Sequence, residues 1–265
     1  MANPTAPLLS VRDLTIMAGQ RPLIRHCSWH VQAGEILIIV GESGSGKTTL
    51  LKTAAGIPDQ DLACTDGEIA YAGVPLKRPS DWQALRSRDM QYLFQDALSS
   101  FCPVRTVYDQ LWDAARFSGM PKDTFDQVLA DRTAVLSLRS DALKTWPQNL
   151  SGGMIQRAEL LFSLIQPPRL LFADEPTSAV DSVTQKKMAQ ALLRLRRHHR
   201  TAIVLVTHDI RLAAFLADTL LILKAGEIVE YGPAASLLAQ PRSEYTRRLL
   251  TLSGLKGGDL HASGN

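Results

Sequence analysis

Cysteine and long hydrophobic runs are both scarce in this chain of 265 residues, and each absence excludes a class of protein. The three cysteines, Cys27, Cys64 and Cys102, lie far apart and form no CxxC pair. The sequence therefore predicts neither a disulfide framework nor a structural zinc site, and it favours a reduced, cytosolic setting. No uninterrupted apolar stretch approaches the roughly 20 residues that cross a bilayer. The first residues lack the basic start and apolar core of a signal peptide. We therefore expect any role at a membrane to depend on partner chains.

An excess of one charge is also missing. The 29 Lys and Arg residues and 26 Asp and Glu residues leave a formal net charge of +3, which is too small to indicate a nucleic-acid footprint. The basic residues are scattered apart from the run 194–200, which we interpret as a solvated face near a helix C-terminus. Hydrophobic residues make up 45% and charged residues 21%, as in ordinary globular proteins. The length fits one α/β domain with room for a small inserted subdomain.

Hydrophobic patterning indicates two kinds of strand. Apolar and polar residues alternate around 11–16 and 27–31, which is typical of half-buried antiparallel strands. Continuous apolar runs predict strands buried on both faces instead, at 36–40, 170–173 and 203–206. Helical spacing separates these runs, notably at 183–197, so the sequence predicts a mostly parallel sheet flanked by helices. A closing hairpin is expected at 220–231.

The middle of the chain has a different pattern. Between 97 and 148 there is no convincing buried strand, whereas 107–117 and 125–138 carry helical spacing. We interpret this stretch as a helical subdomain inserted into the α/β domain. The predicted parts are the domain 1–235, with core segments 1–96 and 149–235 and the insert 97–148, and a C-terminal helical tail at 236–265, whose end from 254 is expected to fray.

A glycine-rich loop follows the first continuous apolar run. The stretch 41–48 reads GESGSGKT, matches GxxxxGK[ST] and lies between a predicted strand and a predicted helix. In this motif the backbone N–H groups wrap phosphates at a helix N-terminus, Lys47 reaches the β- and γ-phosphates, and the Thr48 hydroxyl ligates Mg²⁺. The motif predicts a nucleoside triphosphate site but leaves kinases, GTPases and ATPases open. Its predicted binding residues are Gly41, Glu42, Ser43, Gly44, Ser45, Gly46, Lys47, Thr48 and Thr49.

A later motif decides between families of phosphate-loop proteins. The stretch 150–157 reads LSGGMIQR, which resembles the signature motif of ABC ATPases. It is another Ser/Gly loop opening a helix, so Ser151, Gly152 and Gly153 are expected to form a second anion site. The resemblance implies that this loop contacts ATP held by a partner.

Two acidic residues, a histidine and a glutamine complete the series. The stretch 170–176 reads LLFADEP, so Asp174 lies where a strand-end carboxylate can hold Mg²⁺ and Glu175 where it can polarise the attacking water. SAVD at 178–181 resembles the D-loop of the family. His208, in VTHD, matches its switch histidine, which contacts the γ-phosphate. Gln95, in YLFQD, matches the glutamine that touches Mg²⁺ and joins the core to the helical subdomain.

The resemblance covers about 8–250, with all five elements in the order of the family. It implies an α/β fold with a RecA-like P-loop core, an antiparallel β-subdomain and an inserted helical subdomain. It also implies hydrolysis of ATP with Mg²⁺, a second ATPase subunit in a homo- or heterodimer, two transmembrane permeases and, indirectly, an extracytoplasmic substrate-binding protein. No nucleic-acid partner is expected. The implied location is peripheral, on the cytoplasmic face of a bacterial inner membrane.

Further stretches look like the ATPases of the peptide and nickel importer family, namely GESGSGK, the region 94–110 and EYTRRLL at 244–250. The chain departs from the usual pattern of that family at Ala97, Phe101, Cys102, Ser243 and Glu244. Peptide-importing members often run longer and contain a C-terminal cysteine cluster, and this sequence has no cysteine after Cys102. The resemblance therefore favours the nickel or metallophore branch and leaves dipeptide and oligopeptide import open.

Three further interpretations belong to other functional classes: a soluble ABC ATPase acting on ribosomes or DNA, a regulatory subunit that does not hydrolyse ATP, and half of an exporter. The first class usually has two cassettes or long coiled coils in one chain, and exporter cassettes are commonly fused to membrane spans. The sequence has no second cassette, no long coiled coil and no membrane span, and Lys47, Glu175 and His208 are all present. These observations favour a hydrolysing importer subunit.

One residue of the family pattern is missing. ABC ATPases usually place an aromatic residue in the first β-hairpin, where it stacks on adenine. LTIMAGQRP at 14–22 contains none, and Ala18 falls near that position. Base stacking is worth about 1–3 kcal/mol on other aromatic platforms. The sequence therefore predicts weak discrimination between ATP and GTP.

Overall fold

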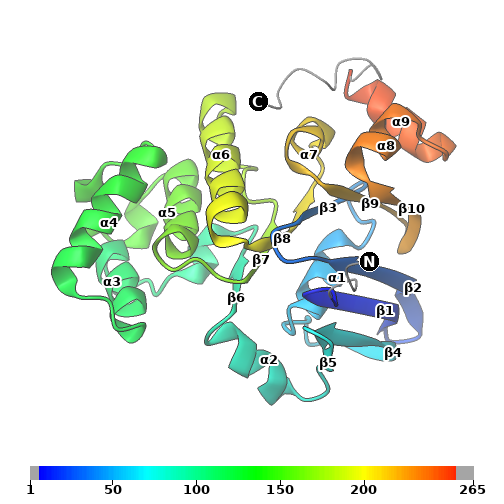
Figure 1. Ribbon diagram of the computed structural model, residues 1–265, viewed down its shortest axis with the longest axis horizontal. Helices are drawn as coiled ribbons and strands as arrows, with labels where there is room; N and C mark the ends of the chain where they lie inside the picture. The colour runs from blue at the N-terminus through cyan, green and yellow to red at the C-terminus, as the bar shows by residue number, and fades with distance from the viewer. Residues whose placement is uncertain (1–5, 255–265) are drawn as a thin grey trace, which may run out of the picture.

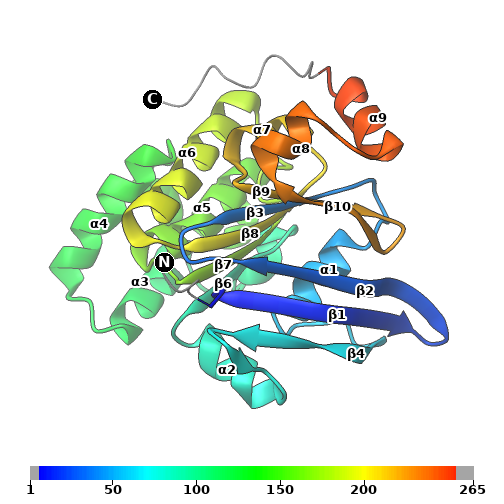
Figure 2. The same cartoon turned by 45° about the vertical axis from the view of Figure 1, so that its right-hand side comes forward.

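The computed structural model describes residues 6–254 as two β-sheets with helices packed around them (Figures 1 and 2). In the larger sheet every pairing is parallel except that of the last two strands. Its strands are, in spatial order, β10 (Glu227–Pro233), β9 (Thr219–Lys224), β3 (Ile36–Val40), β8 (Ala202–Thr207), β7 (Leu170–Asp174) and β6 (Met90–Leu93). The three predicted buried strands and the closing hairpin are confirmed.

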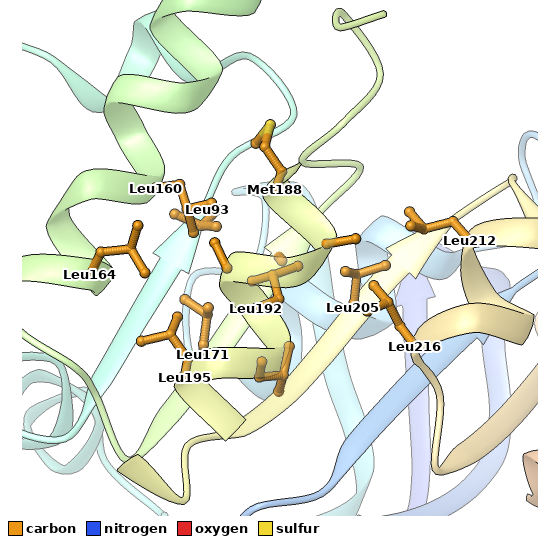
Figure 3. Close-up of a cluster of buried hydrophobic side chains, with 14 of the residues drawn as sticks. Leu93, Leu160, Leu164, Leu171, Met188, Leu192, Leu195, Leu205, Leu212 and Leu216 are labelled. Carbon is orange, nitrogen blue, oxygen red and sulfur yellow. The ribbon is translucent and has the colours of Figure 1, made fainter. Parts of the chain in front are cut away.

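Both faces of this sheet are covered, which explains why its central strands are apolar at every position. Successive residues of β3 point to opposite faces, so Ile38 lies in one apolar cluster and Ile39 in the other. Figure 3 shows the first cluster, where Leu192 of α6 (Ser182–His199) lies beside Leu205 of β8. α5 (Gly152–Ile165) and α7 (Ile210–Leu216) contribute to the same cluster, and α1 (Lys47–Ala54) contributes to the other.

The smaller sheet is antiparallel and has the spatial order β2-β1-β4-β5. Its strands are β1 (Leu9–Ala18), β2 (Arg21–Val31), β4 (Leu62–Tyr71) and β5 (Val74–Pro75). The first two were predicted from their alternation, and most of their apolar residues are buried, including Leu14 and Trp29. β4 was not predicted because its residues up to Glu68 are almost all exposed and give no alternating signal.

Four further strands and α-helices escaped the sequence analysis because they are short: β5, β6, α7 and α2 (Pro79–Arg86). β6 buries only its first and last residues, Met90 and Leu93, which is too little for a pattern of period two. Its position matters for function, since Gln95 follows it directly.

The region between β6 and α5 is helical throughout its regular structure. It contains η1 (Ala97–Ser100), α3 (Val107–Phe117), α4 (Lys122–Val135), η2 (Ser140–Lys144) and η3 (Pro147–Asn149). α3 has the predicted bounds, whereas α4 begins and ends three residues earlier than predicted. The chain leaves the helix at Ser137, whose φ is 51°, while Leu136 and Leu138 remain buried and so prolong the apolar pattern. The predicted limits of the subdomain, 97 and 148, remain a prediction.

The C-terminal part consists of α8 (Ala234–Ala239) and α9 (Glu244–Leu252), so the predicted boundary at 235/236 falls within α8. The Glu230 carboxylate accepts hydrogen bonds from the backbone N–H groups of Arg242 and Ser243, which ties the start of α9 to β10. The predicted frayed end, apart from Gly254, lies outside the described residues. Within residues 6–254, no helix is both long and apolar enough to span a bilayer.

The basic run at the end of α6 is exposed except at Leu195 and Arg196. The guanidinium of Arg196 forms an ion pair with Asp218 and donates a hydrogen bond to Gly34 O at 3.1 Å. The prediction of a solvated face is therefore wrong at Arg196, because this side chain joins α6 to the loops that flank β3 and β9.

Candidate functional site

The loop between β3 and α1 needs its glycines for geometric reasons. Gly44 and Gly46 have φ angles of 77° and 98°, in the left-handed region that other residues rarely adopt. A side chain at Gly41 would place its Cβ 2.2 Å from the carbonyl oxygen of Leu223 in β9. The loop then ends at the N-terminus of α1, where unpaired N–H groups and the helix dipole favour an anion.

Lys47 lies inside this loop with 6% of its surface exposed. Its Nζ donates hydrogen bonds to Gly41 O at 2.9 Å and to Glu42 O at 2.8 Å. Burial lowers the pKa of Lys47, and the negative charges of Glu175 and Asp174 oppose that shift. The ammonium group is therefore held in the loop, where a bound phosphate would offset the free-energy cost of its burial.

The end of β7 meets the start of α1 at Asp174, which is 1% exposed. Thr48 Oγ1 donates a hydrogen bond to Asp174 Oδ1 at 2.9 Å, and Tyr92 Oη donates to Oδ2 at 3.3 Å. Burial raises the pKa of Asp174, and the two hydrogen bonds oppose the shift. Hydroxyl and carboxylate oxygens are the hard ligands that Mg²⁺ prefers, so the donor set of Thr48 and Asp174 fits this ion. Tyr92 was missed because β6 was not predicted.

Glu175 and His208 are in contact. His208 Nδ1 lies 3.1 Å from Glu175 Oε2. Glu175 has a φ of 46°, a conformation that costs a non-glycine residue about 1–3 kcal/mol. Its N–H donates to Val206 O at 3.0 Å, which holds the backbone in that conformation. The turn directs the side chain away from the end of β7 and toward the residue that follows β8.

A cavity of about 630 Å³ brings most of the predicted residues together. Its lining comprises Leu23, Ser43, Gly44, Gly46, Lys47, Thr48, Thr49, Gln95, Glu175 and His208. Asp174 adjoins this lining through its hydrogen bond with Thr48. Gly41, Glu42 and Ser45 do not line the cavity, and the N–H of Glu42 donates to Tyr245 Oη of α9 at 3.1 Å. From the first hairpin, Leu23 lines the cavity and Ala18 does not.

The predicted signature residues are not brought to this cavity. Ser151 is the N-cap of α5 and accepts a hydrogen bond from Met154 N, while Gly152 and Gly153 form the first turn. A Cβ at Gly153 would lie 3.1 Å from Ala179 O, so this turn packs closely against the stretch 178–181. The Gln156 side chain adds a hydrogen bond to Ser178 Oγ at 3.1 Å. The turn that was predicted to bind a second anion and the stretch that resembles the D-loop are thus packed together; anion binding at this turn remains a prediction.

One buried carboxylate near the site was missed by the sequence analysis. Glu159 of α5 is 3% exposed and accepts hydrogen bonds from Phe94 N, at 2.9 Å, and from Ser100 Oγ. Burial raises the pKa of Glu159 to about 7. The only signal in the sequence is a glutamate among apolar residues in RAELLF, which a solvated helix face would also explain.

A family model and the most similar relatives with curated names all point to the same family. A family model described as ABC transporter matches residues 24–178. The metal-staphylopine import system ATP-binding protein CntD of Staphylococcus aureus is 32% identical over 251 residues, which cover 92% of each chain. The dipeptide transport ATP-binding protein DppD of Bacillus subtilis is 34% identical, over 92% of this chain and 76% of its own.

Solved structures share the fold. A dimeric, post-hydrolysis state of the ATP-binding cassette MJ0796 bound to ADP and Pi aligns with a TM-score of 0.75 and 24% identity. The alignment covers 85% of this chain and 98% of the cassette. The protein cbiO1 of Clostridium perfringens, part of the ABC transporter complex cbiONQ, gives a TM-score of 0.74 at 21% identity. This alignment covers 93% of this chain and 95% of the cbiO1 chain.

Proposed function

Because this chain belongs to the ABC transporter family and is the ATPase subunit of an importer, we propose that it hydrolyses ATP in the cavity above Lys47 to drive uptake of a metal chelate. One observation carries the hydrolysis in this proposal: a single cavity is lined by Lys47, Gln95, Glu175 and His208, which come from four separate parts of the chain. Such a convergence of phosphate-binding, polar and acid–base groups fits phosphoryl transfer to water.

The charged residues that line the cavity and the residues of the phosphate loop have roles in this proposal. Lys47 and the N–H groups of the loop bind the β- and γ-phosphates, and Glu175 polarises the attacking water. His208 orients the Glu175 carboxylate through their contact and reaches the γ-phosphate. Attack by water on the γ-phosphorus breaks its bond to the bridging oxygen and releases ADP and phosphate. The remaining nucleotide-binding residues are Gly41, Glu42, Ser43, Gly44, Ser45, Gly46 and Thr49.

Thr48 and Asp174 supply oxygen donors for Mg²⁺ in this proposal, and Gln95, which lines the same cavity as Thr48, would add its amide oxygen. When bound, the ion would neutralise charge that develops on the phosphates. Asp174 is kept oriented by two hydrogen bonds, from Thr48 and from Tyr92. Tyr92 is therefore a positioning residue in this proposal.

The active unit in this proposal is a dimer of ATPase chains that meet head to tail. Ser151, Gly152 and Gly153 form an anion-binding helix N-terminus, yet they do not line the cavity of their own chain. A second chain can place its signature loop against the γ-phosphate held above Lys47. ATP then becomes part of the interface, and its hydrolysis opens the dimer. The partner is a related ATPase subunit or a second copy of this chain.

The proposed cargo is a nickel ion or another metal in chelated form. The similarity that favours it is the one to the metal-staphylopine import protein CntD, which is 32% identical over 92% of this chain. Import of dipeptides or oligopeptides is the second candidate, favoured by the slightly higher identity of 34% to DppD. The metal is cargo here, and within the described residues no group of three His, Cys, Asp or Glu side chains could bind one.

The subunit lies, in this proposal, on the cytoplasmic face of the bacterial inner membrane. It docks on two permease subunits, which receive the cargo from an extracytoplasmic binding protein. The helical region between Ala97 and Asn149 is the part of the chain that would pass the opening motion to a permease.

Uptake measurements distinguish the two candidate cargoes. Cells of the source bacterium that carry Glu175→Gln in this subunit are compared with wild-type cells for uptake of radioactive nickel, with and without an added chelator, and for uptake of a labelled dipeptide. Loss of chelate uptake alone supports the metal branch, and loss of dipeptide uptake alone contradicts it. If both remain normal, the importer assignment to these cargoes is wrong.

A further inference from the structure

Glu159 holds both ends of the segment that contains Gln95. Its Oε1 accepts the Phe94 N–H at 2.9 Å and the Ser100 hydroxyl. These donors lie at the start and the end of the stretch 94–100, and Gln95 of this stretch lines the ATP cavity. One oxygen atom of α5 therefore fixes the position of the whole segment.

This arrangement is not explained by stability. Glu159 is 3% exposed, and among residues 6–254 it takes part in no ion pair. Neighbouring residues of the segment and of α5, such as Ala97 and Leu160, are buried apolar groups. Asp96 is the charged group that faces it from the segment, and its negative charge disfavours ionisation of Glu159 further. An apolar side chain of similar size would avoid this desolvation cost but would leave the Phe94 N–H and the Ser100 hydroxyl without this acceptor, so the carboxylate serves these hydrogen bonds and not packing.

The other end of α5 is the signature loop. Ser151 caps the helix, and Gly152 and Gly153 form its first turn. With a rise of about 1.5 Å per residue, Glu159 lies roughly 12 Å along the axis from Ser151. α5 is a continuous helix over Gly152–Ile165, and such a helix moves as one body. A displacement of the signature loop therefore reaches Glu159 with little loss.

We propose that Glu159 is a positioning residue that couples the two ATP sites of the dimer. When the signature loop closes on ATP held by the partner, α5 moves, and the Glu159 carboxylate moves Phe94 and thereby Gln95 in its own cavity. Each chain thus adjusts its own site according to whether its partner holds ATP. This coupling rests on the head-to-tail dimer of the proposed function.

Cooperativity is the readout that a merely structural role would not change. Three variants are compared with the wild type in the assembled dimer: Glu159→Leu removes the acceptor, Glu159→Gln keeps an acceptor for the Phe94 N–H, and Ser100→Ala releases one end of the segment. ATP hydrolysis is measured against ATP concentration, with the melting temperature and the binding of ATP to the isolated chain as controls.

We expect wild type and Glu159→Gln to give a Hill coefficient above 1, toward the limit of 2 set by two sites. Glu159→Leu should lower it to about 1 and reduce kcat several-fold with unchanged ATP binding. The melting temperature should change little, because relief of the desolvation cost offsets the loss of the acceptor. Ser100→Ala should give an intermediate Hill coefficient.

Two results would overturn the coupling. One is a wild-type Hill coefficient in Glu159→Leu or, if that variant does not fold, in Ser100→Ala. The other is non-cooperative hydrolysis by an active wild-type dimer. A wild type without ATPase activity, or one fully active as a monomer, would contradict the proposed function instead, so the two failures are distinguishable.

Discussion

His208 Nδ1 lies 3.1 Å from Glu175 Oε2, so the residues that follow two neighbouring strands meet over the cavity. β7 and β8 are parallel, with Asp174 paired to Val206, so both strands end at the same edge of the sheet. The contact orients both side chains at once. The two proposed catalytic residues should therefore act as one unit.

Replacing Glu175 should separate binding from hydrolysis. Glu175→Gln keeps the size and a hydrogen-bonding oxygen but removes the group that polarises water, so turnover should fall by about 10²–10⁴-fold while ATP still binds. Lys47→Ala is the matched control and should weaken binding itself. Steady-state ATPase assays and nucleotide titrations check both, and near-normal hydrolysis by Glu175→Gln would refute the catalytic assignment.

The contact between His208 and Glu175 predicts non-additive kinetics. His208→Ala alone should slow ATP hydrolysis by roughly 10-fold or more. In a Glu175→Gln background the same change should have much less effect, because the carboxylate that it orients is already gone. A double-mutant cycle on kcat measures the difference, and fully additive losses would mean that the two residues act independently.

The signature loop should matter only after dimerisation. Ser151→Arg places a bulky side chain at the exposed N-terminus of α5, so it should block closure of the dimer and abolish cooperative hydrolysis. Binding of ATP to the isolated chain should be unchanged, since Ser151 does not line that cavity. Light scattering of the Glu175→Gln protein with ATP, with and without Ser151→Arg, checks this. Full activity of a monomer that is insensitive to Ser151→Arg contradicts the dimer mechanism.

The cavity should discriminate only weakly between adenine and guanine nucleotides. Leu23, which is not aromatic, is the residue of the first hairpin that lines the cavity, so ATP and GTP should be hydrolysed with kcat/KM values within about tenfold of each other. Leu23→Phe should lower KM for both nucleotides, whereas Ala18→Phe should not, because Ala18 lies outside the lining. A thousandfold preference of the wild type for ATP would show that another residue supplies the stack.

Glu159 should make stability depend on pH. Its folded-state pKa of about 7 lies above the ordinary glutamate value of 4.5, so the folded chain binds the proton more tightly than the unfolded chain. The free energy of unfolding should therefore fall as pH rises from about 4.5 to 7, by about 3 kcal/mol from this group, and change no further above that range.

Urea unfolding of wild type and Glu159→Gln from pH 4.5 to 8 isolates this contribution. The variant cannot ionise at this position, so the difference between the two curves should grow with pH in favour of Glu159→Gln. A constant difference over the whole range would mean that the Glu159 pKa is not raised.

Elements whose signal is local were predictable. The central strands β3, β7 and β8 are apolar at nearly every position because both faces are covered, and the phosphate loop needs glycine where φ is positive or where Leu223 O approaches. α3 was located to the residue because its apolar face follows the helical period. β4 and β6 were not, because an exposed strand and a four-residue strand leave no period to detect.

The family, the order of its motifs and the residue types that phosphate and Mg²⁺ chemistry require can all be read from the sequence, since each motif is a short stretch with its own geometric reason. Which of these residues meet depends on the tertiary structure. Parallel strands bring their carboxyl ends to one edge, so Thr48 reaches Asp174 across 126 positions and Glu175 reaches His208. It also separated Ser151 from the cavity and buried Glu159 against the Gln95 segment. Neither feature has a local signature in the sequence, because both depend on how α5 packs against the rest of the chain and not on the hydrophobic period of α5.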